Sequence, residues 1–210
     1  MKKKILVACL CVALAVLTVA GTTLAYLTSK DTVTNTFTVG NVAITLDEKD
    51  TDNDSNVDDN VTVNGVVRDK ANAYHLMPGG SYVKDPTVHV ANTSENSWIF
   101  VKVVNGISAF EATSGNGYKT IAEQIKDNGW TELTGVTGVT GVYYKAFTKS
   151  ADATGNTDWV VFSNFQISDN ANTVQGWSDI GAGNNIVVTA YAIQKEGFNT
   201  AAAAWAEVSK

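Results

Sequence analysis

Short runs that alternate apolar and polar residues recur along most of this chain, and clusters of Asn, Gly, Asp and Ser separate them. Alternation with a period of two places one face of a strand in a core and the other in water, and short runs bounded by turn residues are typical of strands. Residues 42–46 follow this pattern, with Val42, Ile44 and Leu46 on one face, and Thr34–Val39 continue it towards the N-terminus. The sequence therefore predicts an all-β domain of antiparallel strands.

Two runs, Trp98–Val104 and Ile186–Ile193, are largely apolar on both faces. Strands that are covered on both sides lie near the middle of a sheet, so we expect these two to pack inside a sandwich. Further strands are expected at 61–67, 82–91, 142–147 and 159–167. Six or more short strands with turn signals between them favour a jelly-roll-like antiparallel β-sandwich.

Helix signals are found at two places. Thr120 and Glu123 form a capping box, and Gly129 can end the helix that it begins. Near the C-terminus, Thr200 can cap residues 201–208, whose alanines favour a helix. We therefore expect one or two short helices beside the sheets.

The first 25 residues have the pattern of a secretory signal peptide. Lys2–Lys4 precede an uncharged run, Ile5–Ser29. Thr23 and Ala25 supply the small residues that signal peptidase requires, so we expect cleavage between Ala25 and Tyr26. The secreted domain is then residues 26–210.

Two other interpretations of this segment exist. A retained membrane anchor is one, because the apolar run approaches the roughly 20 residues that span a bilayer. Ser29, Lys30 and Asp31 follow it in place of a cluster of stop-transfer cations, which favours cleavage. The other is a lipoprotein signal at Leu6–Cys9, but there the cysteine lies too close to the lysines to leave an apolar region before it.

The cysteines and the charge limit what the secreted domain can bind. Cys9 and Cys11 both lie in the signal, which excludes a disulfide framework and a thiolate metal site in residues 26–210. The chain has 15 basic and 21 acidic residues, a net charge of −6, and loss of Lys2–Lys4 leaves 12 basic residues and a net charge of −9. Such a surface argues against nucleic acid or anionic lipid as a partner, and a divalent cation is a more natural counter-ion.

The densest charged segment, 47–60, is a candidate calcium site. Its oxygen-bearing side chains at alternate positions are Asp50, Asp52, Asp54, Asn56 and Asp58. A looping backbone with this spacing can direct successive oxygens at one hard cation. The segment departs from the EF-hand pattern, because Ser55 replaces the turn glycine and Val61 the bidentate glutamate. Either a structural Ca²⁺ ion or a solvated acidic loop fits the sequence.

No catalytic motif is visible in the sequence. The two histidines, His75 and His89, are not part of a His-Glu-x-x-His motif, and no thiol nucleophile remains after residue 25. His89 lies between two valines, so we expect it on a strand surface in a structural role. Among the tryptophans, Trp130 and Trp177 follow glycines and are the best candidates for exposure on a carbohydrate-binding surface.

Several segments together resemble the TasA/camelysin-like group of Gram-positive bacteria, whose signal peptides the peptidase SipW removes. The resemblance covers the whole chain and is carried by Leu24–Thr28, Asn35–Val42, Leu76–Gly80, Lys84–Val88, Phe100–Val103 and Thr189–Gln194. It implies a jelly-roll sandwich that is secreted to the cell surface and assembles as a homo-oligomer into fibres of the biofilm matrix. Camelysin is described as a metalloprotease, but no ligand set can be carried over to this sequence.

The resemblance also implies assembly by a donor strand. Residues 26–39 would complete the sheet of the next subunit, and Val33, Phe37 and Val39 would set the register. The alternative is that these residues form the first strand of their own domain. A monomeric adhesin or glycan-binding module and a camelysin-like protease are the competing functions. Matrix or cell-wall components are the expected partners, with membrane contact only through an uncleaved signal.

Overall fold

The computed structural model of the chain describes residues 40–210, apart from 53–60, 64, 116, 151–154 and 182. The expected cleavage site at Ala25 and Tyr26 lies outside these residues, as do Val33, Phe37 and Val39 of the expected donor strand and three of the five expected calcium ligands, Asp54, Asn56 and Asp58. Within the described residues, no helix has the length and apolar character needed to cross a membrane.

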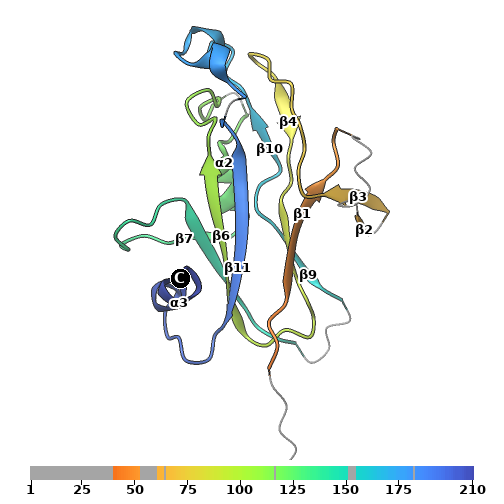
Figure 1. The fold of residues 1–210 in the computed structure, drawn as a ribbon, viewed down its shortest axis with the longest axis vertical. Helices are drawn as coiled ribbons and strands as arrows, with labels where there is room; N and C mark the ends of the chain where they lie inside the picture. Colours follow the sequence, from red (N-terminus) through yellow and green to blue (C-terminus); the bar gives the residue numbers. More distant parts are fainter. Residues whose placement is uncertain (1–39, 53–60, 64, 116, 151–154, 182) are drawn as a thin grey trace, which may run out of the picture. The chain divides into compact units, whose positions relative to one another are not determined.

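One sheet has five strands in the order β2-β3-β1-β5-β9 (Figure 1). These are β2 (Val61–Val63), β3 (Val66–Asp69), β1 (Ile44–Lys49), β5 (Thr87–Val90) and β9 (Thr157–Val160). All neighbours pair antiparallel. The β1–β5 pairing covers Ile44–Asp47, whereas β3 pairs with β1 only at Glu48 and Lys49.

The second sheet has four strands in the order β11-β6-β8-β7, again antiparallel throughout. They are β11 (Ile186–Gln194), β6 (Ser97–Asn105), β8 (Val142–Phe147) and β7 (Thr131–Glu132). A separate two-stranded sheet joins β4 (Ser81–Val83) to β10 (Asn164–Gln166). Two turns of 3₁₀-helix follow it, η1 (Ala171–Thr173) and η2 (Trp177–Asp179).

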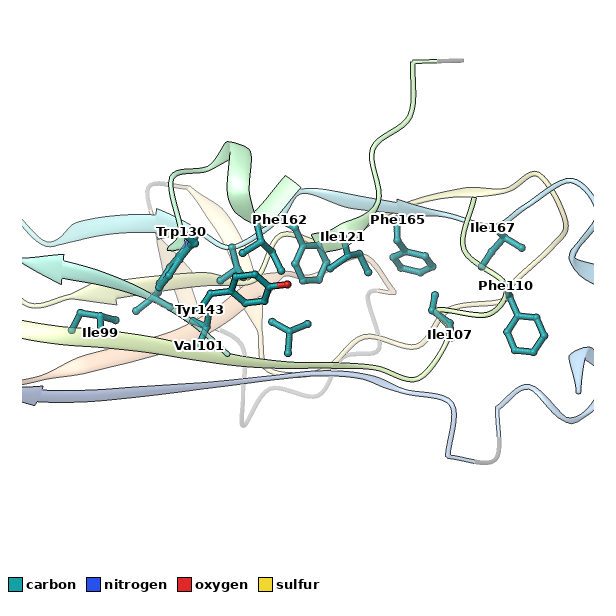
Figure 2. Close-up of a cluster of buried hydrophobic side chains, with 14 of the residues drawn as sticks. Ile99, Val101, Ile107, Phe110, Ile121, Trp130, Tyr143, Phe162, Phe165 and Ile167 are labelled. Carbon is teal, nitrogen blue, oxygen red and sulfur yellow. The ribbon is translucent and has the colours of Figure 1, made fainter. Parts of the chain in front are cut away.

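The main hydrophobic core draws side chains from both large sheets. Val88 and Val90 of β5 and Ile99 and Val101 of β6 are fully buried in it. Alternate residues of each strand supply these contacts, as the period of two requires. Figure 2 shows Ile99, Val101, Ile107, Phe110, Ile121, Trp130, Tyr143, Phe162, Phe165 and Ile167 of this cluster lying in a row between the ribbons.

A second, smaller core covers the outer face of the β6–β11 pair. The helix α3 (Ala201–Val208) places Trp205 against Phe100 of β6 and Tyr191 of β11, with ring centroids 5.3 and 5.2 Å apart. Thr200 caps α3 by accepting a hydrogen bond from the Ala203 amide at 3.2 Å. This contact explains why both strands are apolar on their outer faces as well.

Both predicted helices are confirmed. In α2 (Ile121–Asp127), Thr120 and Glu123 form the expected capping box, and Gly129 follows the helix with a positive φ of 79°. The prediction of an all-β antiparallel fold with one or two short helices is likewise confirmed. The jelly-roll order of the strands stays a prediction.

Three predicted strands are each two strands in the structure. Residues 61–67 form the β2–β3 hairpin, which turns at Gly65. The runs 82–91 and 159–167 are also broken, the first at Asp85–Pro86, where proline removes a ladder donor. The short strand β7 was not predicted, because two residues carry no periodicity.

The expected position of the last strand is wrong. The prediction placed Ile186–Ile193 near the middle of a sheet, but β11 pairs with β6 alone among the described strands and lies at the sheet edge. Its faces are covered by α3 and by the main core, so its apolar sequence reflects coverage of its faces and not a second neighbouring strand.

Candidate functional site

The outward edge of β11 presents backbone groups without a partner strand among the described residues. The Lys195 amide donates a hydrogen bond to Asn96 O at 2.7 Å, and the Gly106 amide donates one to Asn185 O at 3.0 Å. The backbone N–H and C=O groups of the odd-numbered residues of β11 therefore point to β6. Antiparallel ladders alternate, which directs the N–H and C=O groups of the even-numbered residues away from β6. Side chains of these same residues, Ile186, Val188, Ala190 and Ala192, point into the main core.

A second open edge belongs to β1. Over Ile44–Asp47 this strand pairs with β5 on one side only, because its pairing with β3 begins at Glu48. Ile44 and Leu46 face the main core but are only half-buried. Two edges that lack a neighbour in the described structure thus belong to the two different sheets.

A groove of about 870 Å³ lies beside one end of each edge, at Leu46–Glu48 of β1 and Ile186–Val188 of β11. Its apolar lining comes from both sheets and the loops beside them, through Leu46, Ile107, Phe165, Ile180, Ile186 and Val188. Leu46 and Val188 stay half-buried, whereas equivalent core residues of β5 and β6 are fully covered. The main core is therefore incompletely covered along this line.

One end of the groove is polar. Glu48 is 4 % exposed, and its carboxylate accepts hydrogen bonds from Lys84 Nζ at 2.5 Å and from Asn72 Nδ2 at 2.9 Å. Asn72 also bridges to Thr51, whose amide donates to Asn72 Oδ1 at 2.6 Å. Burial raises the pKa of the neighbouring Tyr74 to about 12. These groups satisfy one another and close the apolar part of the groove.

A network of charged side chains links β1 to its neighbouring strands. Arg68 of β3 pairs with Asp47 of β1 and, at 3.1 Å, with Asp85. His89 of β5 lies between two carboxylates, with Nε2 3.0 Å from Asp47 Oδ1 and Nδ1 2.6 Å from Asp158 Oδ1 of β9. Three adjacent strands are thus linked by one imidazole.

The surroundings of His89 favour its charged form. Burial by itself lowers the pKa of this histidine, but the hydrogen bonds and negative charges of Asp47 and Asp158 act in the opposite direction and outweigh it. Its pKa therefore lies above the ordinary value of 6.5. His89 is only 7 % exposed, so the expectation that it lies on a strand surface is wrong.

The structure describes two of the expected calcium ligands, Asp50 and Asp52. Asp52 Oδ2 accepts a hydrogen bond from the Ala73 amide at 2.5 Å, which ties this end of the segment to the chain after β3. Among the residues that the structure covers, no group of three or more His, Cys, Asp or Glu side chains is arranged to hold a metal ion.

The expected aromatic surface is also corrected. Trp130 is only 2 % exposed and donates its indole N–H to Val160 O at 3.0 Å, so it belongs to the core. Trp177 is half-buried against Phe110, with ring centroids 5.6 Å apart. Neither residue forms an open platform for a sugar.

Comparison of the chain with protein-family models, curated proteins and solved structures gives no match. The fold and the site thus define its class on their own: an antiparallel all-β protein whose two sheets leave an apolar groove beside open edges. Sequence reasoning did not locate this groove. The one sequence feature that points to it is the two-sided apolar pattern of β11, the last strand before the final helix.

Proposed function

We propose that this protein is secreted and assembles into extracellular biofilm-matrix fibres by strand exchange, with residues 26–39 of one subunit filling the β1–β11 groove of the next. The observation that carries the proposal is the pair of open edges beside a half-covered apolar core. An unpaired strand edge is a template for pairing with another chain, which natural proteins normally cover.

Residues 26–39 match what the groove lacks. A strand added to β11 would gain main-chain hydrogen bonds from the even-numbered residues, and its side chains would select the register. Val33, Phe37 and Val39 fall on one face at a period of two, so all three can enter the apolar lining together. The other face is rich in threonine, which suits a strand that faces solvent.

The way the chain enters β1 favours exchange between subunits. Asn41 O accepts a hydrogen bond from the Glu95 amide at 2.8 Å, and Ala43 O accepts one from the Ala91 amide at 3.0 Å. Residues 41–43 therefore continue the line of β1 and do not form a loop. The tightest common hairpin needs a two-residue loop, so a hairpin here would take Val39 as well as Gly40 into the turn, and Val39 could not then enter the groove. Folding of 26–39 back onto its own β1 is thus disfavoured.

The two walls of the groove constrain how a strand can lie in it. β1 and β11 run in opposite directions, as the colour sequence in Figure 1 shows. A strand between them would pair antiparallel with one wall and parallel with the other. Parts of β1 and β11 lie within 8 Å of each other, whereas a strand paired with both needs walls about 9.6 Å apart, so its entry would have to separate the two strands there. Mixed sheets of this kind are common, and the incoming strand would join the two sheets through its backbone.

Disulfide trapping tests the exchange directly, because the chain after residue 25 has no cysteine. One preparation carries Phe37→Cys and a second carries Val188→Cys, and the two are mixed under mild oxidation. We expect a disulfide between different chains, seen as a dimer on a non-reducing gel and mapped by mass spectrometry. No mixed dimer at any protein concentration would refute the proposal.

Val104→Cys is the matched control for this experiment. Val104 lies on the outer face of the neighbouring strand β6, where it is 52 % exposed, and it does not line the groove. Its thiol is therefore more accessible than that of Val188→Cys and yet lies outside the groove. Equal trapping at both positions would indicate random collision. Electron microscopy of residues 26–210 and 40–210 completes the test, with fibres expected only from the longer chain.

A structural calcium ion on Asp50, Asp52, Asp54, Asn56 and Asp58 also remains part of the proposal. A ligand that binds only the folded state raises the thermal midpoint. We expect added Ca²⁺ to raise the midpoint of the secreted chain and Asp54→Asn to reduce that rise. An unchanged midpoint would identify the segment as a solvated loop.

A further inference from the structure

We propose that His89 is a proton-dependent clamp on β1, and that its protonation regulates how readily the groove captures a strand. The clamp itself is independent of fibre formation, whereas the regulation rests on the function proposed above. His89 is buried, and a carboxylate from each strand that pairs with β5 reaches it, Asp47 from β1 and Asp158 from β9.

The charges around His89 are unequal in sign. Asp47 reaches it from β1 and Asp158 from β9, while Asp85 and Arg68 lie beside Asp47. Apart from His89, the cluster therefore holds three carboxylates and one guanidinium, and only Asp47 and Asp85 contact that guanidinium. A protonated His89 brings this cluster closer to neutrality, and each neighbouring carboxylate then keeps a cationic partner.

Both ring nitrogens lie within hydrogen-bonding distance of a carboxylate oxygen. Only the imidazolium can donate from both, because a neutral ring has one N–H and one lone pair. Loss of the proton must therefore leave a lone pair facing either Asp47 or Asp158. The Nδ1 contact is the shorter at 2.6 Å, so we expect the neutral ring to keep Asp158 and to lose Asp47.

Loss of the bond to Asp47 would act on the wall of the groove. Asp47 lies between Leu46 and Glu48, whose side chains point to the opposite face of β1 and line the groove. This part of β1 pairs with β5 alone. When His89 holds Asp47, β1 presents a fixed edge to an incoming strand. When that hydrogen bond is lost, the edge of β1 is no longer fixed.

The direction of the pH effect follows from the raised pKa. Stabilisation by a cationic His89 is fully present below about pH 6.5 and is lost as the pH rises through the folded-state pKa. Thermal unfolding of the secreted chain tests this step without any assembly. We expect the midpoint of the wild type to fall by about 2–4 °C more between pH 5.5 and 8.5 than that of His89→Gln.

His75→Gln is the matched control, because His75 is the other histidine of the chain and is exposed. It should keep the pH dependence of the wild type. If the wild type and His89→Gln lose the same number of degrees, the clamp is wrong whether or not fibres form.

Seeded fibre growth of the wild type and of His89→Gln tests the regulation. Lower pH also weakens self-repulsion of this acidic chain, but that effect is common to both proteins. We expect growth of the wild type to slow several-fold more between pH 5.5 and 8.5 than growth of His89→Gln. Equal slowing of the two would overturn the regulation. Absence of fibres at every pH, with the thermal difference present, would overturn the proposed function and support the clamp alone.

Discussion

The strands β6 and β11 are both nine residues long and both apolar on two faces, yet one is central and the other lies at an edge. In β6, Ile99, Phe100 and Val101 are completely buried. In β11, the four residues that face the main core are only half-buried. The two strands thus have similar sequences and cover different amounts of their inner faces.

The strongest test of this comparison removes matched aromatic rings from the two strands. Phe100 and Tyr191 are directly opposite each other, and both contact Trp205. We expect Phe100→Ala to lower the free energy of unfolding by about 3–5 kcal/mol, because it leaves a closed cavity. Tyr191→Ala should lower the free energy of unfolding by clearly less, because Tyr191 is only half-buried. Urea unfolding of both variants measures the difference, and equal losses would contradict the comparison.

Proline substitutions distinguish the two sides of β11. The amide of Thr189 points to β6, whereas that of Ala190 points to the open edge. We expect Thr189→Pro to lower the unfolding free energy by about 2–3 kcal/mol, because it removes a ladder hydrogen bond and leaves a carbonyl of β6 unpaired. Ala190→Pro should be less destabilising.

Assembly should reverse this order. Ala190→Pro removes a backbone donor that the incoming strand would use, so disulfide trapping in a folded Ala190→Pro chain should fall sharply. If that variant stays folded and captures Phe37→Cys as well as the unsubstituted groove does, the incoming strand does not pair with β11.

The cap of α3 provides a smaller effect. This helix covers the outer face shared by β6 and β11, and its Thr200 satisfies the Ala203 amide. Thr200→Ala should cost about 1 kcal/mol, as is usual for loss of an N-cap. Thr200→Ser, which keeps the hydroxyl, is the control and should retain most of the stability. Thermal unfolding of both variants decides whether the cap matters.

The smallest effect is expected where β6 and β11 are equally exposed. Val104 and Val187 are directly opposite and 52 % and 47 % exposed. Val187→Lys should change stability by less than about 0.5 kcal/mol. Val104→Lys should leave trapping at Val188 unaffected, because Val104 does not line the groove. Loss of trapping in Val104→Lys would mean that the outer face takes part in assembly.

Local signals in the sequence predicted the elements well but not their limits. The capping box at Thr120 and the cap at Thr200 each act within one helical turn, so sequence spacing alone reveals them. Strand breaks such as the one at Asp85–Pro86 depend on which partner each half finds. Periodicity therefore predicted which side chains of each strand face the core, but it did not predict where one strand ends and the next begins.

The candidate site depends on contacts that sequence separation hides. Asp47, His89 and Asp158 come from three strands and meet only because those strands are neighbours. His89 between two valines has the pattern of a surface residue, and the carboxylates that cover it could not be assigned to it from spacing. Trp130 was misjudged for the same reason, since its partner at Val160 belongs to a distant strand.

The extended entry of residues 41–43 into β1 has a consequence for the architecture of the proposed polymer. A subunit that gives its tail to one neighbour and receives another from the opposite side forms a head-to-tail contact, which produces an open filament wherever the rotation between subunits does not close a ring. Every filament would then terminate in a vacant acceptor at one extremity and an unused tail at the other. Filaments that are treated with a synthetic peptide of residues 26–39, washed and then given fresh subunits should fail to elongate at the first extremity and still grow at the second.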